Sequence, residues 1–210
     1  MPPGAVGAKQ LMGASGLGHE SAALVLARLS KVAVGDFMLA GPQMNPDLLS
    51  HLMTVVQGAQ WRHREVDDAV EVLAAFGGFE TAVMVGVMLV AASKRHLIMV
   101  DGITACAALM VASRIADSVT DYCVFCRSSG HQGLDQALEL FHASALLNLG
   151  LDTQDGTGAC LSYPLVRSAA ALLTEVADGE DPGPSLPAGV GPAVVQSQDG
   201  RDNSILSSGY

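Results

Sequence analysis

The sequence predicts an α/β fold in which helices cover both faces of a doubly wound parallel sheet. The main observation is a series of short apolar runs at 97–101, 122–126 and 146–149, each followed by a segment with helical spacing. Strands that are apolar along their whole length are typical of a parallel sheet buried on both faces. Half of the 210 residues are hydrophobic and 15% are charged, so the chain can build a sizeable core.

Capping residues and apolar spacing define the helices in chain order. Asn45 followed by Pro46 is typical of a helix cap and a first helical position. Gly77 and Gly78 separate two apolar helical segments. The predicted helices cover residues 19–30, 47–56, 66–76, 80–93, 104–116, 133–142 and 158–176.

Residues 11–178 are expected to form one α/β domain with loose ends. We expect residues 1–10 to be flexible, and residues 179–210, where proline and glycine recur, to be a disordered tail. The longest uncharged apolar run, Thr81–Ser93, is shorter than the roughly 20 residues of a membrane span, and the first residues do not resemble a signal peptide. We therefore expect a cytoplasmic protein that does not associate with a membrane.

The charge of the chain argues against nucleic-acid binding, and the pattern of its cysteines argues against a metal or redox site. The chain has 21 acidic and 11 basic residues, and its net charge of −10 argues against a nucleic-acid partner. Cys123 and Cys126 have C-x-x-C spacing, which is used in redox and metal sites. Because they lie inside an apolar run, and no second pair or suitably spaced histidine completes a zinc site, we expect a buried structural pair and no metal.

Small, polar or charged residues follow the predicted strands, at the sheet edge where parallel sheets bind ligands. Asp101-Gly102 follows the first apolar run, 127–130 follow the second, and 152–158 follow the third. A further glycine-rich turn, 16–18, precedes the first helix. In a single turn of this kind, the glycines usually serve only the geometry of the turn. Several such turns on one edge of the sheet, however, predict a site where backbone N–H groups bind a phosphate or nucleotide.

Several motifs, in order along the chain, resemble the nicotinate-nucleotide–dimethylbenzimidazole phosphoribosyltransferases. They are Phe-Gly-Gly-Phe-Glu at 76–80, Ile-Met-Val-Asp-Gly at 98–102, Asp-Tyr-Cys-Val-Phe at 121–125, Leu-Leu-Asn-Leu-Gly at 146–150 and Asp-Gly-Thr-Gly-Ala at 155–159. The resemblance covers residues 13–177 and implies a Rossmann-like fold and a dimer. It also implies transfer of ribosyl phosphate from nicotinate mononucleotide to a benzimidazole base, without a metal or organic cofactor.

The resemblance assigns roles to individual residues. Asp155 stands where the family has its catalytic glutamate, which removes the benzimidazole proton. The residues expected to bind substrate are Gly16, Gly18, His19, Asp101, Gly102, Arg127, Ser129, Gly130, Gly156 and Thr157. Two alternatives remain open: Asp101 could cap the next helix, and His19, Arg127 and His131 could be ordinary solvated residues at helix starts.

The chain departs from the family pattern at several of these positions. Asp155 is one methylene shorter than glutamate, Ala14 replaces a second glutamate, and Leu52 replaces a lysine. The family is also longer, and the N-terminal part that supplies much of its benzimidazole pocket is missing from this sequence, so we expect either a fragment or a shortened paralogue. The alternative function is therefore a catalytically degenerate paralogue that binds a nucleotide or pairs with another subunit.

Overall fold

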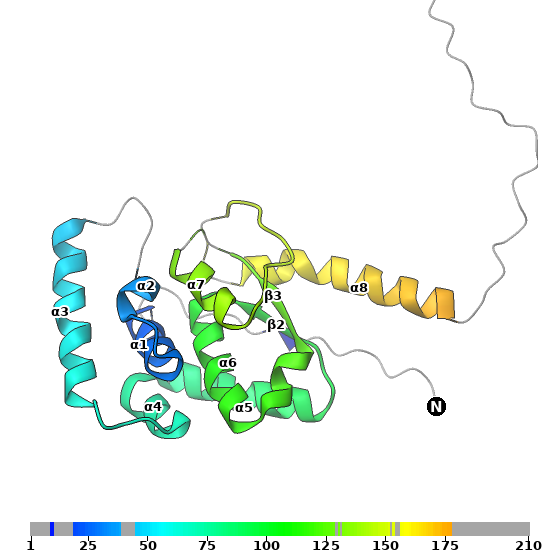
Figure 1. The fold of residues 1–210 in the computed structure, drawn as a ribbon. Coiled ribbons are helices and arrows are strands. Elements are labelled where there is room, and N and C mark those ends of the chain that lie inside the picture. The colour runs from blue at the N-terminus through cyan, green and yellow to red at the C-terminus, as the bar shows by residue number, and fades with distance from the viewer. Residues whose placement is uncertain are drawn as a thin grey trace, which may run out of the picture. The chain divides into compact units, whose positions relative to one another are not determined.

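A computed structural model describes residues 9–10, 19–38, 45–128, 130, 132–151, 153 and 156–177 (Figure 1). The chain divides into two compact units, and the boundary between Ala170 and Ala171 falls inside the last helix. The elements in chain order are β1 (Lys9–Gln10), α1 (His19–Ser30), α2 (Val34–Met38), α3 (Pro46–Arg62), α4 (Ala69–Phe76), α5 (Phe79–Ser93), β2 (Ile98–Asp101), α6 (Ile103–Ile115), the 3-10 helix η1 (Asp117–Tyr122), β3 (Cys123–Cys126), α7 (Gln132–Leu140) and α8 (Thr157–Ala177).

A small parallel sheet confirms the predicted α/β class. The strand order is β1-β2-β3, and both pairs are parallel, with Ile98 opposite Cys123 and Asp101 opposite Cys126. The prediction of a strand at 146–149 is wrong. Leu146 donates one backbone hydrogen bond to the carbonyl of Phe125 at 2.8 Å, but the segment is irregular. The sheet instead includes β1, which we did not predict.

Helices cover both faces of the sheet, and successive residues of β2 point to opposite sides. Ile98 and Val100 belong to the main core with the residues of α1, α5 and α6. Met99 belongs to a second cluster, together with Ala159 and Val166 of α8. Figure 1 shows β2 and β3 between α6 and α8 in this view. The two-sided burial explains why β2 has no polar residue before Asp101.

The predicted helices form, with boundaries that the caps explain. Asn45 accepts a hydrogen bond from the Asp47 amide and starts α3, which continues six residues beyond its predicted end at Val56, to Arg62. α4 begins three residues later than predicted because Asp68 caps it by accepting from the Val70 and Glu71 amides.

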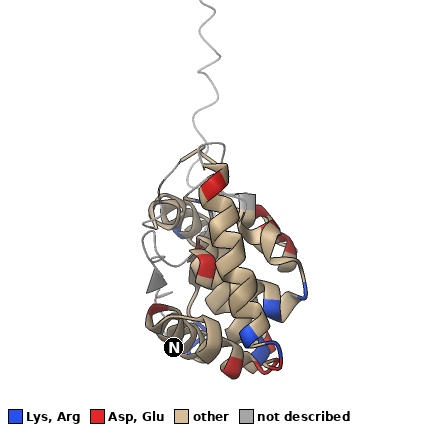
Figure 2. Cartoon of the chain, turned by 90° about the vertical axis from the view of Figure 1, so that its left-hand side faces the viewer, with Lys and Arg blue, Asp and Glu red and all other residues tan. Residues whose placement is uncertain are grey.

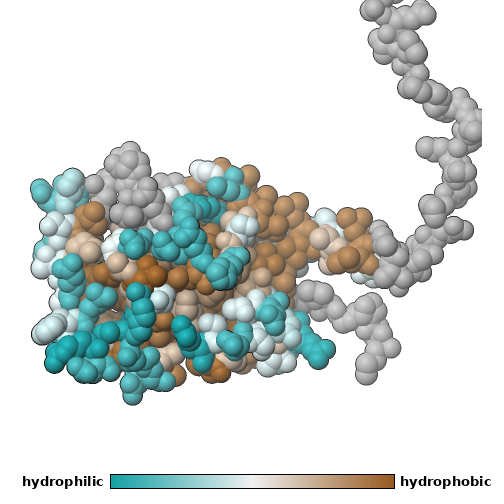
Figure 3. Space-filling model, in the orientation of Figure 1, coloured by the Kyte–Doolittle hydropathy of each residue, from teal (hydrophilic) through white to brown (hydrophobic). Residues whose placement is uncertain are grey.

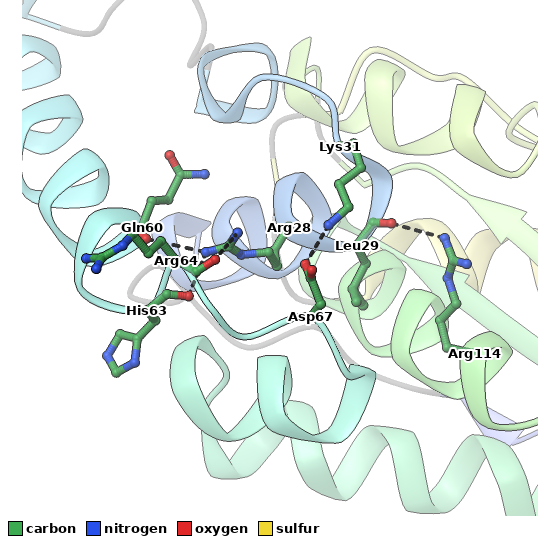
Figure 4. Close-up of polar contacts among 8 residues, drawn as sticks. All are labelled: Arg28, Leu29, Lys31, Gln60, His63, Arg64, Asp67 and Arg114. Carbon is green, nitrogen blue, oxygen red and sulfur yellow. Dashed lines mark hydrogen bonds and ion pairs between the residues drawn. The ribbon is translucent and has the colours of Figure 1, made fainter.

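Charged side chains join α1 to the α3–α4 connection, and Figure 2 shows charges of both signs near one end of α3. The guanidinium of Arg28 donates to the carbonyl oxygens of Gln60, His63 and Arg64, which lie where α3 ends (Figure 4). Lys31 pairs with Asp67 at 2.6 Å. These contacts fix the start of α4 against the end of α1.

α8 presents apolar side chains to the surface as well as to the sheet. Within the first unit, Leu161, Tyr163 and Leu165 are exposed, and Figure 3 shows hydrophobic residues gathered along this helix. None of the helices in the described part of the chain has the length and hydrophobicity that a membrane crossing requires.

Candidate functional site

The site is organised around Asp101, a carboxylate at the end of β2 that is 1% exposed. Its Oδ1 accepts a hydrogen bond from the Ser128 amide at 2.9 Å. Its Oδ2 accepts from the Ser128 hydroxyl and, at 3.0 Å, from the Ala159 amide. A buried carboxylate needs such donors, because an unpaired charge away from water is costly. Asp101 therefore connects the ends of β2 and β3 to the start of α8.

Ser128 and Asp101 accept hydrogen bonds from two amides in the first turn of α8. The residue before α8 is Gly156, which has no side chain and adopts a φ of 80°. The Gly158 amide donates to Ser128 Oγ at 2.7 Å, and the Ala159 amide donates to Asp101. The first intrahelical bond follows, from the Cys160 amide to the Gly156 carbonyl. Two amides at the start of α8 are thus satisfied by Asp101, at the end of β2, and by Ser128, two residues after β3.

Gly158 allows α8 to approach the end of β3 closely. A Cβ atom at this position would lie 2.6 Å from the carbonyl carbon of Arg127 and 2.8 Å from the nitrogen of Ser128. Both neighbours are backbone atoms, so no side-chain rotation can relieve the contact. Glycine is therefore required by packing at this position, whereas Gly102 and Gly156 have positive φ.

The residues around this network are also fixed by hydrogen bonds. The Thr153 amide and hydroxyl both donate to the carbonyl oxygen of Ser128, at 2.8 and 3.2 Å. Arg127 makes a bidentate ion pair with Asp135 of α7. The positive charge of Arg127 is therefore partly compensated before any ligand arrives.

The nearby thiols are kept protonated by their surroundings. Burial raises the pKa of Cys106 to about 12, and the negative charge of Asp101 acts in the same direction. Burial likewise raises the pKa of Cys123 to about 12 and that of Cys126 to about 11. Of the C-x-x-C pair that we expected to be buried, Cys126 is buried and Cys123 is half-buried. In the described residues, no cluster of histidine, cysteine or carboxylate side chains has the arrangement of a metal site.

The structure brings some of the predicted site residues together. Asp101 and Gly102 at the end of β2, Arg127 after β3, and Gly156 with Thr157 at the start of α8 converge on one edge of the sheet. Asp101 does not cap α6, the helix that follows it. The N-cap position of α6 is Gly102, and no side chain caps this helix. The carboxylate of Asp101 instead accepts from the Ala159 amide at the start of α8.

The remaining predicted site residues take no part in the hydrogen bonds around Asp101 that the structure describes, or lie outside the described residues. His19 is the first residue of α1. Two residues later, the Ser21 hydroxyl donates to the Phe76 carbonyl, which places this helix start beside the end of α4. Gly130 is exposed. Several residues lie outside the described part of the chain, namely Ala14, Gly16, Gly18, Ser129, His131, Asp155 and the predicted tail 179–210.

Sequence reasoning missed the role of Ser128 and of the Gly158 and Ala159 amides. No spacing along the chain indicates that these amides bond to residues 30 and 58 positions earlier in the sequence.

The sequence is similar to that of a known enzyme family over most of its length. The sequence model of a family described as "Phosphoribosyltransferase" (DBI_PRT) matches residues 9–183. The nicotinate-nucleotide–dimethylbenzimidazole phosphoribosyltransferase of Cupriavidus taiwanensis is 42% identical over 166 residues, which are 79% of this chain and 48% of that protein. The enzyme of the same name from Dechloromonas aromatica is 38% identical and covers 82% of this chain and 51% of its own length.

The structure of CobT from Thermus thermophilus superposes with a TM-score of 0.69 at 28% identity. The superposition covers 77% of this chain and 49% of that one. The chain thus spans about half the length of the curated relatives it matches.

Proposed function

Because this chain belongs to the DBI_PRT phosphoribosyltransferase family, we propose that it transfers ribosyl phosphate from nicotinate mononucleotide to a benzimidazole base. The products are α-ribazole phosphate and free nicotinate. The observation that carries the proposal is the convergence of Asp101, Arg127 and the Gly156–Ala159 turn on one sheet edge. Parallel sheets bind ligands at that edge, and curated relatives named for this reaction match about four fifths of the chain.

Asp155 is the proposed general base. One benzimidazole nitrogen attacks the anomeric carbon, and the bond from that carbon to the nicotinate nitrogen breaks with inversion. The electron pair of the broken bond leaves with nicotinate, and the proton on the other benzimidazole nitrogen passes to the carboxylate. A side chain one methylene shorter than glutamate must then reach the same proton, and a misplacement of about 1 Å can cost roughly a hundredfold in rate.

The ribosyl phosphate is proposed to lie along the turns at the sheet edge. Gly102, Gly130, Gly156 and Thr157 would face it from the ends of β2 and β3 and from the start of α8, and Arg127 would offer a positive charge. Gly16, Gly18, His19 and Ser129 complete the proposed set. The carboxylate of Asp101 already accepts from protein donors, so its proposed contribution is to hold these turns in place.

An assay with purified chain tests the reaction directly. The chain is incubated with nicotinate mononucleotide and dimethylbenzimidazole, and α-ribazole phosphate is detected by mass. Product should form, fall sharply to a residual rate in Asp155→Ala and increase in Asp155→Glu, which restores the longer family side chain. Nucleotide binding measured by calorimetry without product would overturn the catalytic proposal and leave the degenerate paralogue; neither product nor binding would overturn both.

A homodimer through the corner between α4 and α5 is a further part of the proposal. Phe79 is 93% exposed at the start of α5, and Val70 and Val83 are exposed beside it. An apolar hollow of about 420 Å³, lined by Leu73 and Ala82 among others, adjoins Phe79. A protruding ring next to a hollow can pair with a second copy about a two-fold axis. Light scattering should give twice the chain mass, and the monomer mass for Phe79→Ser; a monomeric wild-type chain would contradict this part.

A cytoplasmic location without a nucleic-acid partner is the last part of the proposal. The net charge of −10 supports the lack of a nucleic-acid partner, because such a surface repels the phosphate backbones of nucleic acids. Cell fractionation and a gel-shift assay with duplex DNA test the two statements separately. Recovery with membranes, or a shifted duplex at physiological salt, would contradict them.

A further inference from the structure

We infer that Asp101 and Ser128 are positioning residues, which hold the first turn of α8 so that Asp155, the residue before Gly156, is aligned for catalysis. The inference rests on the proposed function, and it assigns to both residues a role through Asp155 and not through contact with substrate. It depends on three observations: the hydrogen bonds of the network, the burial of its members, and the close approach at Gly158.

The hydrogen bonds form a continuous connection across three segments of the chain. The Ser128 hydroxyl accepts from the Gly158 amide at 2.7 Å and donates to Asp101 Oδ2. The same carboxylate oxygen accepts from the Ala159 amide at 3.0 Å. The first turn of α8 is therefore hydrogen-bonded to Asp101, at the end of β2, and to Ser128, two residues after β3.

Burial makes the network expensive to break. Asp101 is 1% exposed and Ser128 is 3% exposed, so water cannot replace a lost partner without rearrangement. Removing the Ser128 hydroxyl leaves the Gly158 amide without its acceptor and deprives Asp101 of one donor. The first turn of α8 is expected to shift or loosen as a result.

Close packing limits how the turn can respond. With Gly158 against the backbone of Arg127 and Ser128, the helix start cannot move further toward β3. Gly156, with a φ of 80°, lies directly between this turn and Asp155. A displacement of the turn is thus expected to be transmitted to the general base, where about 1 Å is enough to lower the rate roughly a hundredfold.

Ser128→Ala is the primary test, and Ser162→Ala is its matched control. Ser162 lies on α8 and is 0% exposed, and its hydroxyl takes no part in the bonds that join Asp101, Ser128 and the first turn of the helix. Both substitutions remove one buried hydroxyl, but only the first breaks the network. We expect kcat to fall about tenfold or more in Ser128→Ala with little change in KM for the nucleotide, and about twofold or less in Ser162→Ala.

A double-mutant cycle distinguishes positioning from general destabilisation. If Ser128 acts through Asp155, adding Ser128→Ala to Asp155→Ala should produce little further loss of turnover. An equal additional loss would overturn the inference. An unchanged kcat in Ser128→Ala, with an active wild-type chain, would also overturn it while leaving the proposed function intact. Absence of turnover in the wild-type chain would instead overturn the proposed function and, with it, the positioning role.

Amide hydrogen exchange in the wild-type chain tests the network without any substitution. Amides at a helix start normally exchange fast because they lack an intrahelical acceptor. The Gly158 and Ala159 amides should be protected like those in the interior of α8, because Ser128 and Asp101 accept from them. Rapid exchange at both would overturn the inference even if Ser128→Ala does not fold.

Discussion

Gly158→Ala should destabilise the chain even though alanine is the better helix former. Alanine in a helix is favoured over glycine by about 1 kcal/mol. At position 158, however, the added Cβ would lie 2.6 Å from the Arg127 carbonyl carbon and 2.7 Å from its oxygen. Contacts this short with backbone atoms force the helix start away from β3.

The expected size of the effect follows from the contacts that would be lost. Overpacking of this kind costs about 1–3 kcal/mol. Moving α8 away also weakens the bonds from the Gly158 and Ala159 amides to Ser128 and Asp101, at about 1 kcal/mol each. After subtraction of the gain in helix propensity, the free energy of unfolding should fall by about 2–4 kcal/mol.

Urea unfolding followed by circular dichroism measures this change, and Gly58→Ala is the matched control. Gly58 lies inside α3. A Cβ atom added there would have no heavy atom within 4 Å apart from its chain neighbours and the backbone of its own helix. The control should raise the free energy of unfolding by about 0.5–1 kcal/mol. Equal or greater stability of Gly158→Ala would refute the conclusion that α8 is held in backbone contact with the end of β3.

Three further predictions concern other parts of the molecule. Asp68→Ala should lower the free energy of unfolding by about 1 kcal/mol, because the carboxylate caps α4, whereas Asp67→Asn should leave the urea midpoint unchanged because its ion pair with Lys31 is exposed; equal effects would contradict the assigned cap. Because the pKa of Cys106 is raised to about 12, the unfolded chain releases this proton first as pH rises above about 8.5, so stability should fall between pH 9 and 11. Cys106→Ala should make that decline shallower by about 1.4 kcal/mol per pH unit, and an identical pH dependence would show that the thiol is not buried in the folded chain. Asp135→Asn removes the charge that compensates Arg127, so KM for nicotinate mononucleotide should fall several-fold if Arg127 contacts the phosphate; an unchanged KM would remove Arg127 from the site.

Seven helices and two of the three described strands could be predicted because their signals are local, whereas α2 and η1 were not predicted. Asn45 before Pro46 indicates a helix start, and Gly77-Gly78 indicates a helix end, whatever the rest of the chain does. The run at 146–149 has the same apolar composition as a strand, but Leu146 and Leu149 are 44% and 55% exposed. A strand needs successive hydrogen bonds to a neighbour, and that condition is not encoded in four residues.

The candidate site could be predicted in outline, and the roles within it could not. The rule that ligands bind at the carboxyl ends of parallel strands correctly grouped Asp101, Arg127 and Gly156 on one edge. It could not show that Asp101 is committed to protein donors or that Arg127 is paired with Asp135. Such pairings depend on distances between segments, which no spacing along the chain reveals.

Periodicity, caps and motifs are properties of neighbouring residues, and they predicted the α/β class, the approximate positions of seven helices and the family to which the chain belongs. The hydrogen bonds that hold the start of α8 depend instead on the fold. Asp101 and Ala159 are 58 residues apart and meet because β2, β3 and α8 pack together. Their hydrogen bond exists only in the folded chain, where burial removes water as a competitor.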